Sequence, residues 1–164
     1  MTELNSYRWT KFENGIGTVA IVTLNVEPNI NSKNEIREHY SGKGFTSQGY
    51  IEEVSQYGYE SWKIAARKGL EFAFSRVNNF WTVDIIKIEG RAFTDTNPTV
   101  VGYTVMRAFF DKINFQPDQG EIGRLEEFVM SSWTKPYQEL IPDFSSMKFV
   151  EYAIAGKGNS YRGL

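Results

Sequence analysis

The continuous block from Tyr59 to Ile113 constrains the fold more than any other part of the chain, because its pattern predicts a helix, a strand and a second helix. In the first part, small and apolar residues recur at the three- and four-residue spacing of one helical face: Trp62, Ala65, Ala66, Gly69, Ala73 and Val77. We expect the charged residues between them to cover the exposed face: Glu60, Lys63, Arg67, Lys68 and Glu71. Gly69 costs a helix about 1 kcal/mol relative to alanine, so we expect the helix backbone to lie close against a sheet there.

The second part of the block, Trp81 to Glu89, is rich in valine and isoleucine and too short for another helix. It predicts an inner strand that Gly90 ends. Asn97 followed by Pro98 is typical of a helix start, with a capping side chain and a proline at the first helical position. The second helix is therefore expected to run from there to Ile113.

Before this block, the segments Tyr7 to Phe12 and Thr18 to Val26 alternate, and Asn14-Gly15 between them predicts a hairpin turn. Residues 28 to 48 are polar with little periodicity, and we expect a long loop there. Residues 50 to 57 fit either an early start of the first helix or a short turn.

After the block, Glu121 to Trp133 predicts a third helix, and the alternation over Lys148 to Ala155 predicts a last strand. Residues 156 to 164 contain three glycines and are expected to be a flexible tail. The sequence thus predicts one α+β domain over residues 1–164, with a mixed or antiparallel sheet and helices packed on one of its faces. We expect a core at 17–113 and a C-terminal helix and strand at 114–155.

Composition excludes several classes of protein. The chain has no cysteine, so it can form neither a disulfide framework nor a thiolate metal site. Its start lacks the basic and apolar regions of a signal peptide, and no apolar run is long enough to cross a bilayer. Basic and acidic residues are balanced in both halves, with a net charge of −2. We expect a cytoplasmic protein without a membrane segment, and no basic half that would indicate a nucleic-acid surface.

The segment from Gly17 to Ile113 resembles domain IV of the elongation factor G family of translational GTPases. The matching stretches, in order, are GTVAIVTLNVEP, ARKGLEFAF, TVDIIKIEG and VVGYTVMRAFFDKI, with a polar insertion after the first. The corresponding positions include Gly69, Val83, Asp84 and Gly90. The resemblance implies a β-α-β core in a sheet with helices on one face.

Departures from the family limit what the resemblance implies about activity. The chain has no Gly-x-x-x-x-Gly-Lys-Ser/Thr loop and therefore no GTP-binding domain of that kind. The loops with which such a domain would contact a ribosome are not matched. No functional residue is carried over from the family to this chain.

The residue types that carry catalysis or metal binding do not form a convincing set in the sequence. His39 is the only histidine, and its neighbours Glu35 and Glu38 lie in the expected loop, where we interpret all three as solvated. Serine and threonine are plentiful, but no Gly-x-Ser-x-Gly motif accompanies the histidine. We therefore predict no enzyme, no cofactor and no metal site.

Three further patterns have simple structural interpretations. The pairs Glu52-Glu53 and Glu126-Glu127 are interpreted as surface charge, since neighbours on a helix point about 100° apart. The Asn14-Gly15-Ile16-Gly17 run opens a strand, so it is interpreted as a hairpin turn and not a phosphate loop. Lys63, Arg67 and Lys68 are interpreted as the solvated face of a helix.

Aromatic residues are concentrated outside the central helices: Tyr7, Trp9, Phe12, Tyr40, Phe45, Tyr50, Tyr57 and Tyr59. They fit two interpretations, namely filling the far side and edges of the sheet, or anchoring a protein interface. On the second, we predict a non-catalytic protein-binding module, of which an immunity or inhibitor protein is one form, that binds its partner through Tyr40, Phe45, Tyr50 and Tyr57. The alternative is a module that docks on the ribosome or RNA, and an enzyme acting on a small ligand is the third.

Overall fold

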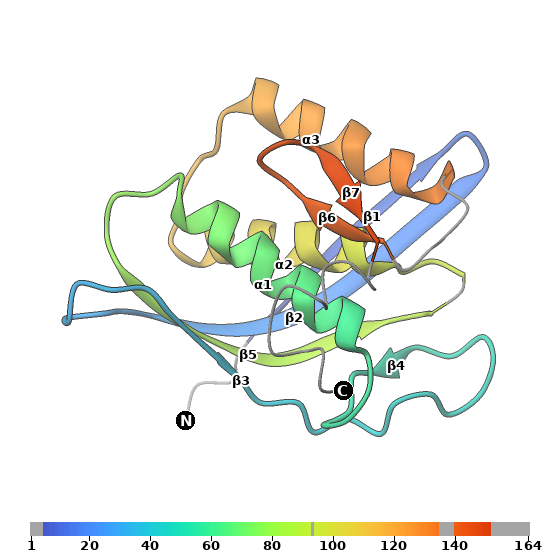
Figure 1. Ribbon diagram of the computed structural model, residues 1–164. Helices are drawn as coiled ribbons and strands as arrows, with labels where there is room; N and C mark the ends of the chain where they lie inside the picture. Colours follow the sequence, from blue (N-terminus) through green and yellow to red (C-terminus); the bar gives the residue numbers. More distant parts are fainter. Residues whose placement is uncertain (1–4, 93, 135–139, 152–164) are drawn as a thin grey trace.

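The computed structural model describes residues 5–92, 94–134 and 140–151, which form two sheets and three α-helices (Figure 1). The strands are β1 (Ser6–Glu13), β2 (Ile16–Pro28), β3 (Glu35–Glu38), β4 (Glu52–Glu53), β5 (Trp81–Gly90), β6 (Ile141–Asp143) and β7 (Lys148–Val150). The helices are α1 (Glu60–Phe74), α2 (Pro98–Lys112) and α3 (Gln119–Ser131), which continues as the 3-10 turn η1 (Ser132–Thr134). The α+β class predicted from the sequence is confirmed.

The main sheet is mixed, with strand order β1-β2-β5-β3. β1, β2 and β5 are antiparallel neighbours, and β3 runs parallel to β5. Strand β4 pairs with the end of β5, where Glu89 also pairs with β2 on its other side, so β4 continues the edge formed by β3. The two-residue turn between β1 and β2 consists of Asn14 and Gly15, both at positive φ, as the Asn-Gly signal predicts.

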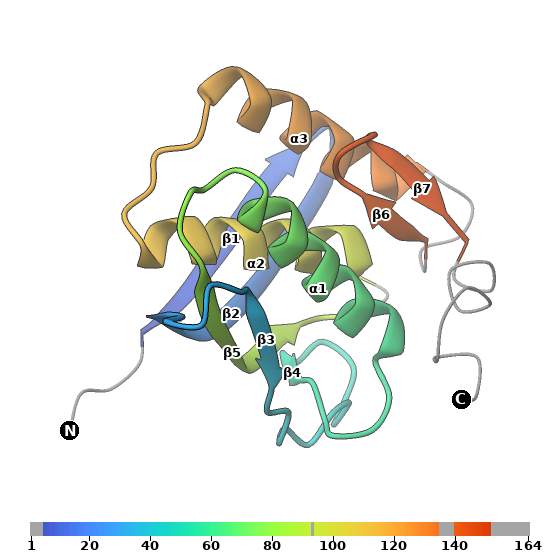
Figure 2. The ribbon, with the colours of Figure 1, turned by 60° about the vertical axis from the view of Figure 1, so that its left-hand side comes forward.

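Helices α1 and α2 cover one face of this sheet, as Figures 1 and 2 show. Strand residues such as Val22, Val83 and Ile85 point to these helices and are fully buried. A third layer, made of α3 and the β6–β7 hairpin, covers the side of the helices away from the sheet. Because it is covered on both sides, α2 is buried along almost its whole length and circumference.

The crossing of α1 and α2 depends on two glycines. A Cβ atom on Gly69 would collide with the carbonyl oxygen of Gly102, and one on Gly102 would lie 2.6 Å from the carbonyl oxygen of Ala65. Gly69 therefore allows close approach of α1 to a second helix, whereas the sequence analysis expected a sheet at that point. The expectation was wrong because a period of small residues does not identify the surface that packs against it.

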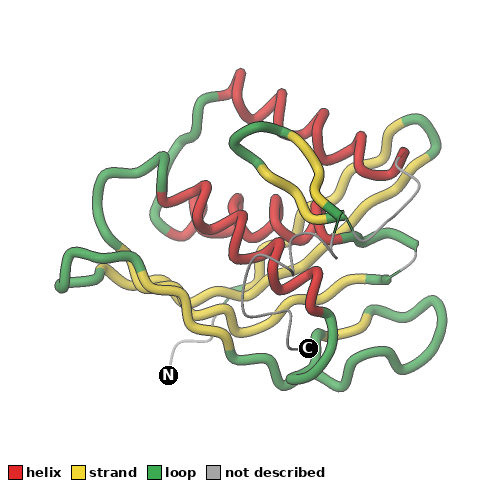
Figure 3. Tube along the Cα trace, viewed as in Figure 1, coloured by secondary structure: helices red, strands yellow, loops and turns green. Residues whose placement is uncertain are grey.

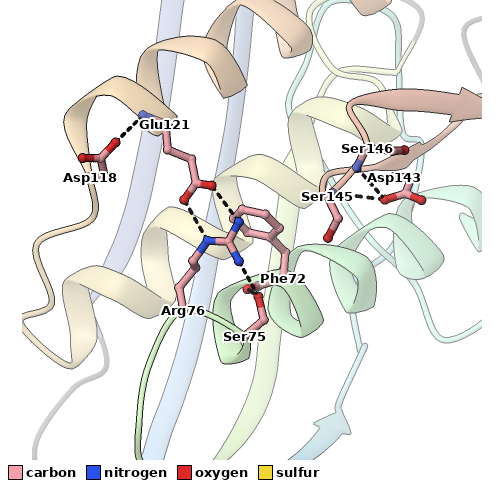
Figure 4. Close-up of polar contacts among 8 residues, drawn as sticks. All are labelled: Phe72, Ser75, Arg76, Asp118, Glu121, Asp143, Ser145 and Ser146. Carbon is pink, nitrogen blue, oxygen red and sulfur yellow. Dashed lines mark hydrogen bonds and ion pairs between the residues drawn. The ribbon is translucent and has the colours of Figure 1, made fainter.

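The third layer is held to the second by aromatic and charged contacts. Phe144 of the β6–β7 hairpin contacts Phe72 of α1, with ring centroids 6.3 Å apart, and Phe128 of α3, with centroids 6.0 Å apart. Figure 4 shows the charged contact, in which Arg76 beyond the end of α1 donates two hydrogen bonds to the carboxylate of Glu121, at 2.8 and 2.6 Å. The Arg76 guanidinium also lies 4.2 Å from the centre of the Phe72 ring.

Capping residues position the starts of two helices. The side chain of Asn97 accepts a hydrogen bond of 2.9 Å from the backbone N–H of Val100, which confirms the predicted start of α2. Asp118 does the same for α3, accepting from the N–H of Glu121 at 2.8 Å (Figure 4). The third helix begins two residues earlier and ends two residues earlier than the predicted range of 121–133.

Short strands account for most differences from the predicted elements. The expected loop at 28–48 contains β3, and the ambiguous stretch 50–57 contains β4. The predicted last strand over 148–155 is β7 at Lys148–Val150, paired with β6, which the sequence analysis did not expect because it contains Pro142. Residues 152–155 of that prediction and the predicted flexible tail at 156–164 lie outside the described residues.

Candidate protein-binding surface

The segment at 40–58, which joins β3 to α1, is the part of the described chain where exposed aromatic side chains are concentrated. Figures 1 and 3 show it as a long, mostly irregular excursion beyond the edge of the sheet, interrupted by β4. Its base is tied down by backbone hydrogen bonds from Gly42 to Val54, from Gly44 to Glu53 and from Val54 to Ile88 of β5, at 2.9–3.1 Å. The segment is therefore anchored to the sheet while its tips face outward.

Three of the four predicted binding residues are exposed on this segment. The exposed fractions are 61% for Phe45, 68% for Tyr50 and 80% for Tyr57. Ile51, the residue that follows Tyr50 in the sequence, is 40% exposed. We call Phe45, Tyr50, Ile51 and Tyr57 the aromatic patch.

Tyr40, the fourth predicted binding residue, is partly buried, and its ring lies under Lys63 of α1. The ammonium of Lys63 lies 4.8 Å from the centre of its ring, and its hydroxyl donates a 2.8 Å hydrogen bond to Glu38. Burial, followed by the nearby Glu38 carboxylate, raises the pKa of the Tyr40 hydroxyl. These contacts give Tyr40 a packing role between β3 and α1.

A cavity of about 220 Å³ opens beside the aromatic patch. It lies between the 45–52 part of the segment and the turn after β5, and its lining is mainly apolar: Phe45, Gln48, Gly49, Tyr50, Glu52, Arg91, Ala92 and Thr94. Two patch residues, Phe45 and Tyr50, therefore form walls of a concave site. The guanidinium of Arg91 reaches across to the Gly49 carbonyl at 3.4 Å and pairs with Asp95 at 3.0 Å.

Glu52 lines this cavity and is only 4% exposed. One carboxylate oxygen accepts a hydrogen bond from the hydroxyl of Tyr59, and the other accepts from the backbone N–H of Ala92 at 3.0 Å. Burial, followed by the hydrogen bond to Glu52, raises the pKa of the Tyr59 hydroxyl, which keeps it a donor. The interpretation of Glu52 as surface charge was wrong, because the fold brings Ala92, a partner distant in the sequence, to its carboxylate.

The cations of α1 are also less exposed than the sequence analysis expected. Lys63 is 6% exposed, and its ammonium donates a 2.9 Å hydrogen bond to the carbonyl of Gln56. Burial lowers the pKa of Lys63. Arg67 donates to both carboxylate oxygens of Glu38 at 2.8 Å. Both side chains therefore join α1 to the neighbouring strand and segment, and the assignment of Lys63 to a solvated face was wrong.

The histidine that the sequence analysis considered lies at the end of β3. Its Nε2 atom is 2.7 Å from Asp84, which Arg37 also contacts at 3.2 Å. Glu38 turns to the helix side to meet Arg67, so it does not join His39. In residues 5–92, 94–134 and 140–151, no three histidine, aspartate or glutamate side chains are placed to hold a metal ion.

Glu126 takes part in a polar network that the sequence analysis missed. Its carboxylate accepts hydrogen bonds from Lys11 of β1 at 3.1 Å and from the buried hydroxyl of Tyr103 at 2.9 Å. Arg107 in turn donates to the Tyr103 hydroxyl at 2.8 Å. The network ties β1, α2 and α3 together. Surface charge was predicted for both Glu126 and Glu127, and of the two only Glu127 is exposed.

A larger cavity of about 350 Å³ lies near the β1–β2 hairpin and the turn after β5. Its lining is more polar than apolar and includes Arg8, Thr10 and Thr18. The Thr18 hydroxyl is already used, since it donates a 2.9 Å hydrogen bond to the carbonyl of Asp95. The lining does not provide a recognisable nucleophile and base.

Comparison with known proteins does not assign the chain to a family. No protein-family model matches the chain, and no curated protein matches its sequence. Among solved structures, the crystal structure of a Thermus thermophilus protein designated ttk003000868 is similar with a TM-score of 0.45 and 13% sequence identity. The similarity covers 62% of this chain and 14% of that one. The resemblance to elongation factor G domain IV stays a prediction from the sequence.

No helix in the described part of the chain has the length and apolar character needed to cross a membrane.

Proposed function

We propose that this chain is a non-catalytic protein-binding module whose partner contacts the aromatic patch. The observation that carries the proposal is the exposure of Phe45, Tyr50 and Tyr57 on a segment whose base is hydrogen-bonded to the sheet. Large aromatic residues are the usual anchors of protein interfaces, since they bury much area for little loss of side-chain freedom. A pre-anchored backbone lowers the ordering cost of binding.

The proposed partner is a protein, and the proposed location is the cytoplasm. The balanced charge of the chain supports recognition by shape and apolar contact in preference to phosphate binding, which requires clustered lysine and arginine. Neutralisation of a toxin by an immunity protein, or inhibition of an enzyme, is the specific form that we propose. No cofactor is part of the proposal.

Capture of the partner tests this proposal. The tagged full chain is incubated with lysate of its own source, with and without RNase and across a salt series. We expect one stoichiometric protein that is retained after RNase and salt. The triple variant Phe45→Ala, Tyr50→Ala and Tyr57→Ala is expected to lose it, because interface anchors of this kind each contribute about 2 kcal/mol or more.

Two controls make the result specific. Phe12 and Ile30 are exposed apolar residues outside the segment, so Phe12→Ala and Ile30→Ala are expected to retain the partner. Tyr40→Phe removes only the hydroxyl contact with Glu38 and keeps the ring under Lys63, so binding should also persist. Recovery of ribosomal components that disappear after RNase treatment would contradict the proposal and favour the ribosome-docking alternative.

A further inference from the structure

We propose that the 220 Å³ cavity beside the aromatic patch binds one lysine or arginine side chain of the protein partner. This inference rests on the proposed function and specifies the chemistry of its central contact. Three properties of the cavity lead to it: its size, its aromatic lining residues and the carboxylate of Glu52, which is in no ion pair within the described residues.

The size of the cavity fits a single side chain. Pockets for drug-sized ligands and cofactors measure about 300–1,000 Å³, and this one is smaller at about 220 Å³. It is also far larger than the space of a single water molecule, which is about 10–15 Å³ by the same kind of measure. An extended side chain inserted from a partner surface is the occupant that matches this size.

The walls favour a cation with an apolar stem. Phe45 and Tyr50 present aromatic rings, and the face of an aromatic ring attracts ammonium and guanidinium groups. Taken as a whole, the lining exposes more apolar than polar surface, which suits the methylene groups that precede the charge in lysine and arginine. A neutral apolar side chain would gain the apolar contact but not the attraction between a cation and the aromatic rings.

The charges around the cavity leave one negative group without a cation. The charges of Arg91 and Asp95 compensate each other, since the Arg91 guanidinium lies 3.0 Å from the Asp95 carboxylate. Glu52 receives hydrogen bonds only from the neutral donors of Tyr59 and Ala92, and none of the ion pairs within the described ranges includes its carboxylate. A partner's cation in the cavity would gain Glu52 as a charged acceptor, and hydrogen bonds between ionised groups are stronger than those between neutral ones.

A capped amino acid tests the cavity without the partner. Nα-acetyl-lysine methylamide is titrated into the ¹⁵N-labelled full chain, with the norleucine analogue, which lacks only the ammonium group, as the matched probe. We expect saturable shifts of the amide signals of Gly49, Tyr50 and Ala92 with the lysine probe. The norleucine probe should bind about tenfold more weakly, the usual effect of losing a hydrogen bond to a charged group. Equal shifts with both probes, or shifts only elsewhere, would overturn the proposal.

Two variants separate the roles of the carboxylate and of the rings. Glu52→Gln should abolish the preference for lysine over norleucine, but it also alters the contacts of Tyr59 and Ala92, so a second variant is needed that leaves the fold intact. The double variant Phe45→Leu and Tyr50→Leu changes exposed residues only, and should weaken lysine binding about fivefold through loss of the ring faces. Tyr57→Leu is the matched control, since Tyr57 lies on the same segment outside the cavity lining. Unchanged lysine binding in the double variant would refute the inference.

The probe titration tests the cavity assignment and the partner capture tests the proposed function, so either can give a negative result without the other. A captured partner that depends on the aromatic patch, together with no lysine binding, would overturn the cavity assignment and leave the proposed function standing. Specific lysine binding without any captured protein would support the cavity assignment and contradict the proposed function.

Discussion

The contact between Gly69 and Gly102 sets the distance between α1 and α2, and it gives a sharp prediction for single residues. Gly69→Ala forces a methyl group onto the backbone of Gly102, so we expect the free energy of unfolding to fall by about 1–3 kcal/mol, the usual cost of overpacking. Urea denaturation at fixed pH measures the change.

Gly123 is the matched control for that substitution. It lies inside α3, and a Cβ atom there would meet nothing within 4 Å. Gly123→Ala should therefore raise the free energy of unfolding by about 0.5–1 kcal/mol through helix propensity alone. Equal effects of the two substitutions would show that the close helix crossing is not what requires Gly69.

At the scale of elements, the pair Arg76 and Glu121 joins the end of α1 to the start of α3 and makes part of the stability depend on pH. The hydrogen bond from Arg76 is the main reason why the pKa of Glu121 lies below its ordinary value of 4.5. A lowered folded-state pKa means that the stabilisation is present above pH 4.5 and is lost as pH falls through the folded-state pKa. We expect Glu121→Gln to cost about 1 kcal/mol at neutral pH, since a partly exposed pair is screened by solvent.

The test compares urea denaturation of the natural chain and Glu121→Gln at about pH 7 and about pH 3. The difference in unfolding free energy should shrink at the lower pH, because protonation of Glu121 removes the charge that pairs with Arg76. Glu127→Gln removes an exposed carboxylate from the same helix and should show little difference at either pH. A difference that is independent of pH would assign the loss to packing and not to charge.

Elements with their own periodicity were predictable from the sequence, and those defined by distant partners were not. The hairpin at Asn14-Gly15 and the capped start of α2 at Asn97 depend on neighbouring residues, so local patterns identified them. Strand β3 has four residues with one apolar side chain, Ile36, and exists because β5 offers it a free edge. Strand β6 includes a proline and depends on pairing with β7 in the same way.

The same distinction explains the candidate site. The exposure of Phe45, Tyr50 and Tyr57 corresponds to one of the two interpretations that the sequence left open for the aromatic residues outside the central helices. The burial of Glu52 was not, since its hydrogen bonds come from Tyr59 and from Ala92, which is forty residues further along the chain. No local pattern in the sequence indicates that a carboxylate faces the cavity.

At the scale of the whole molecule, α2 is shared by every layer, because it packs on the sheet, on α1 and on the third layer. We therefore expect one cooperative unfolding transition, with equal calorimetric and van't Hoff enthalpies. Phe144→Ala removes the ring that contacts both α1 and α3. It should lower the temperature of that single transition, with a loss of about 3 kcal/mol in the free energy of unfolding.

Phe12→Ala is the control for this experiment, since Phe12 is an exposed aromatic residue in the β1–β2 hairpin. It should leave the transition temperature nearly unchanged. Two separate transitions in the natural chain would contradict a single cooperative unit and would assign α3 and the β6–β7 hairpin to an independent one.

The burial of α2 on both sides also has a consequence for biosynthesis. The layer that covers its outer surface is encoded after it, so a growing chain of which only residues 1–118 have emerged carries an apolar helix surface that is not yet covered. Until residues 119–150 leave the ribosome, this surface is available to chaperones and to other nascent chains. The order in which the layers are translated thus makes residues 119–150 responsible for solubility as well as for packing.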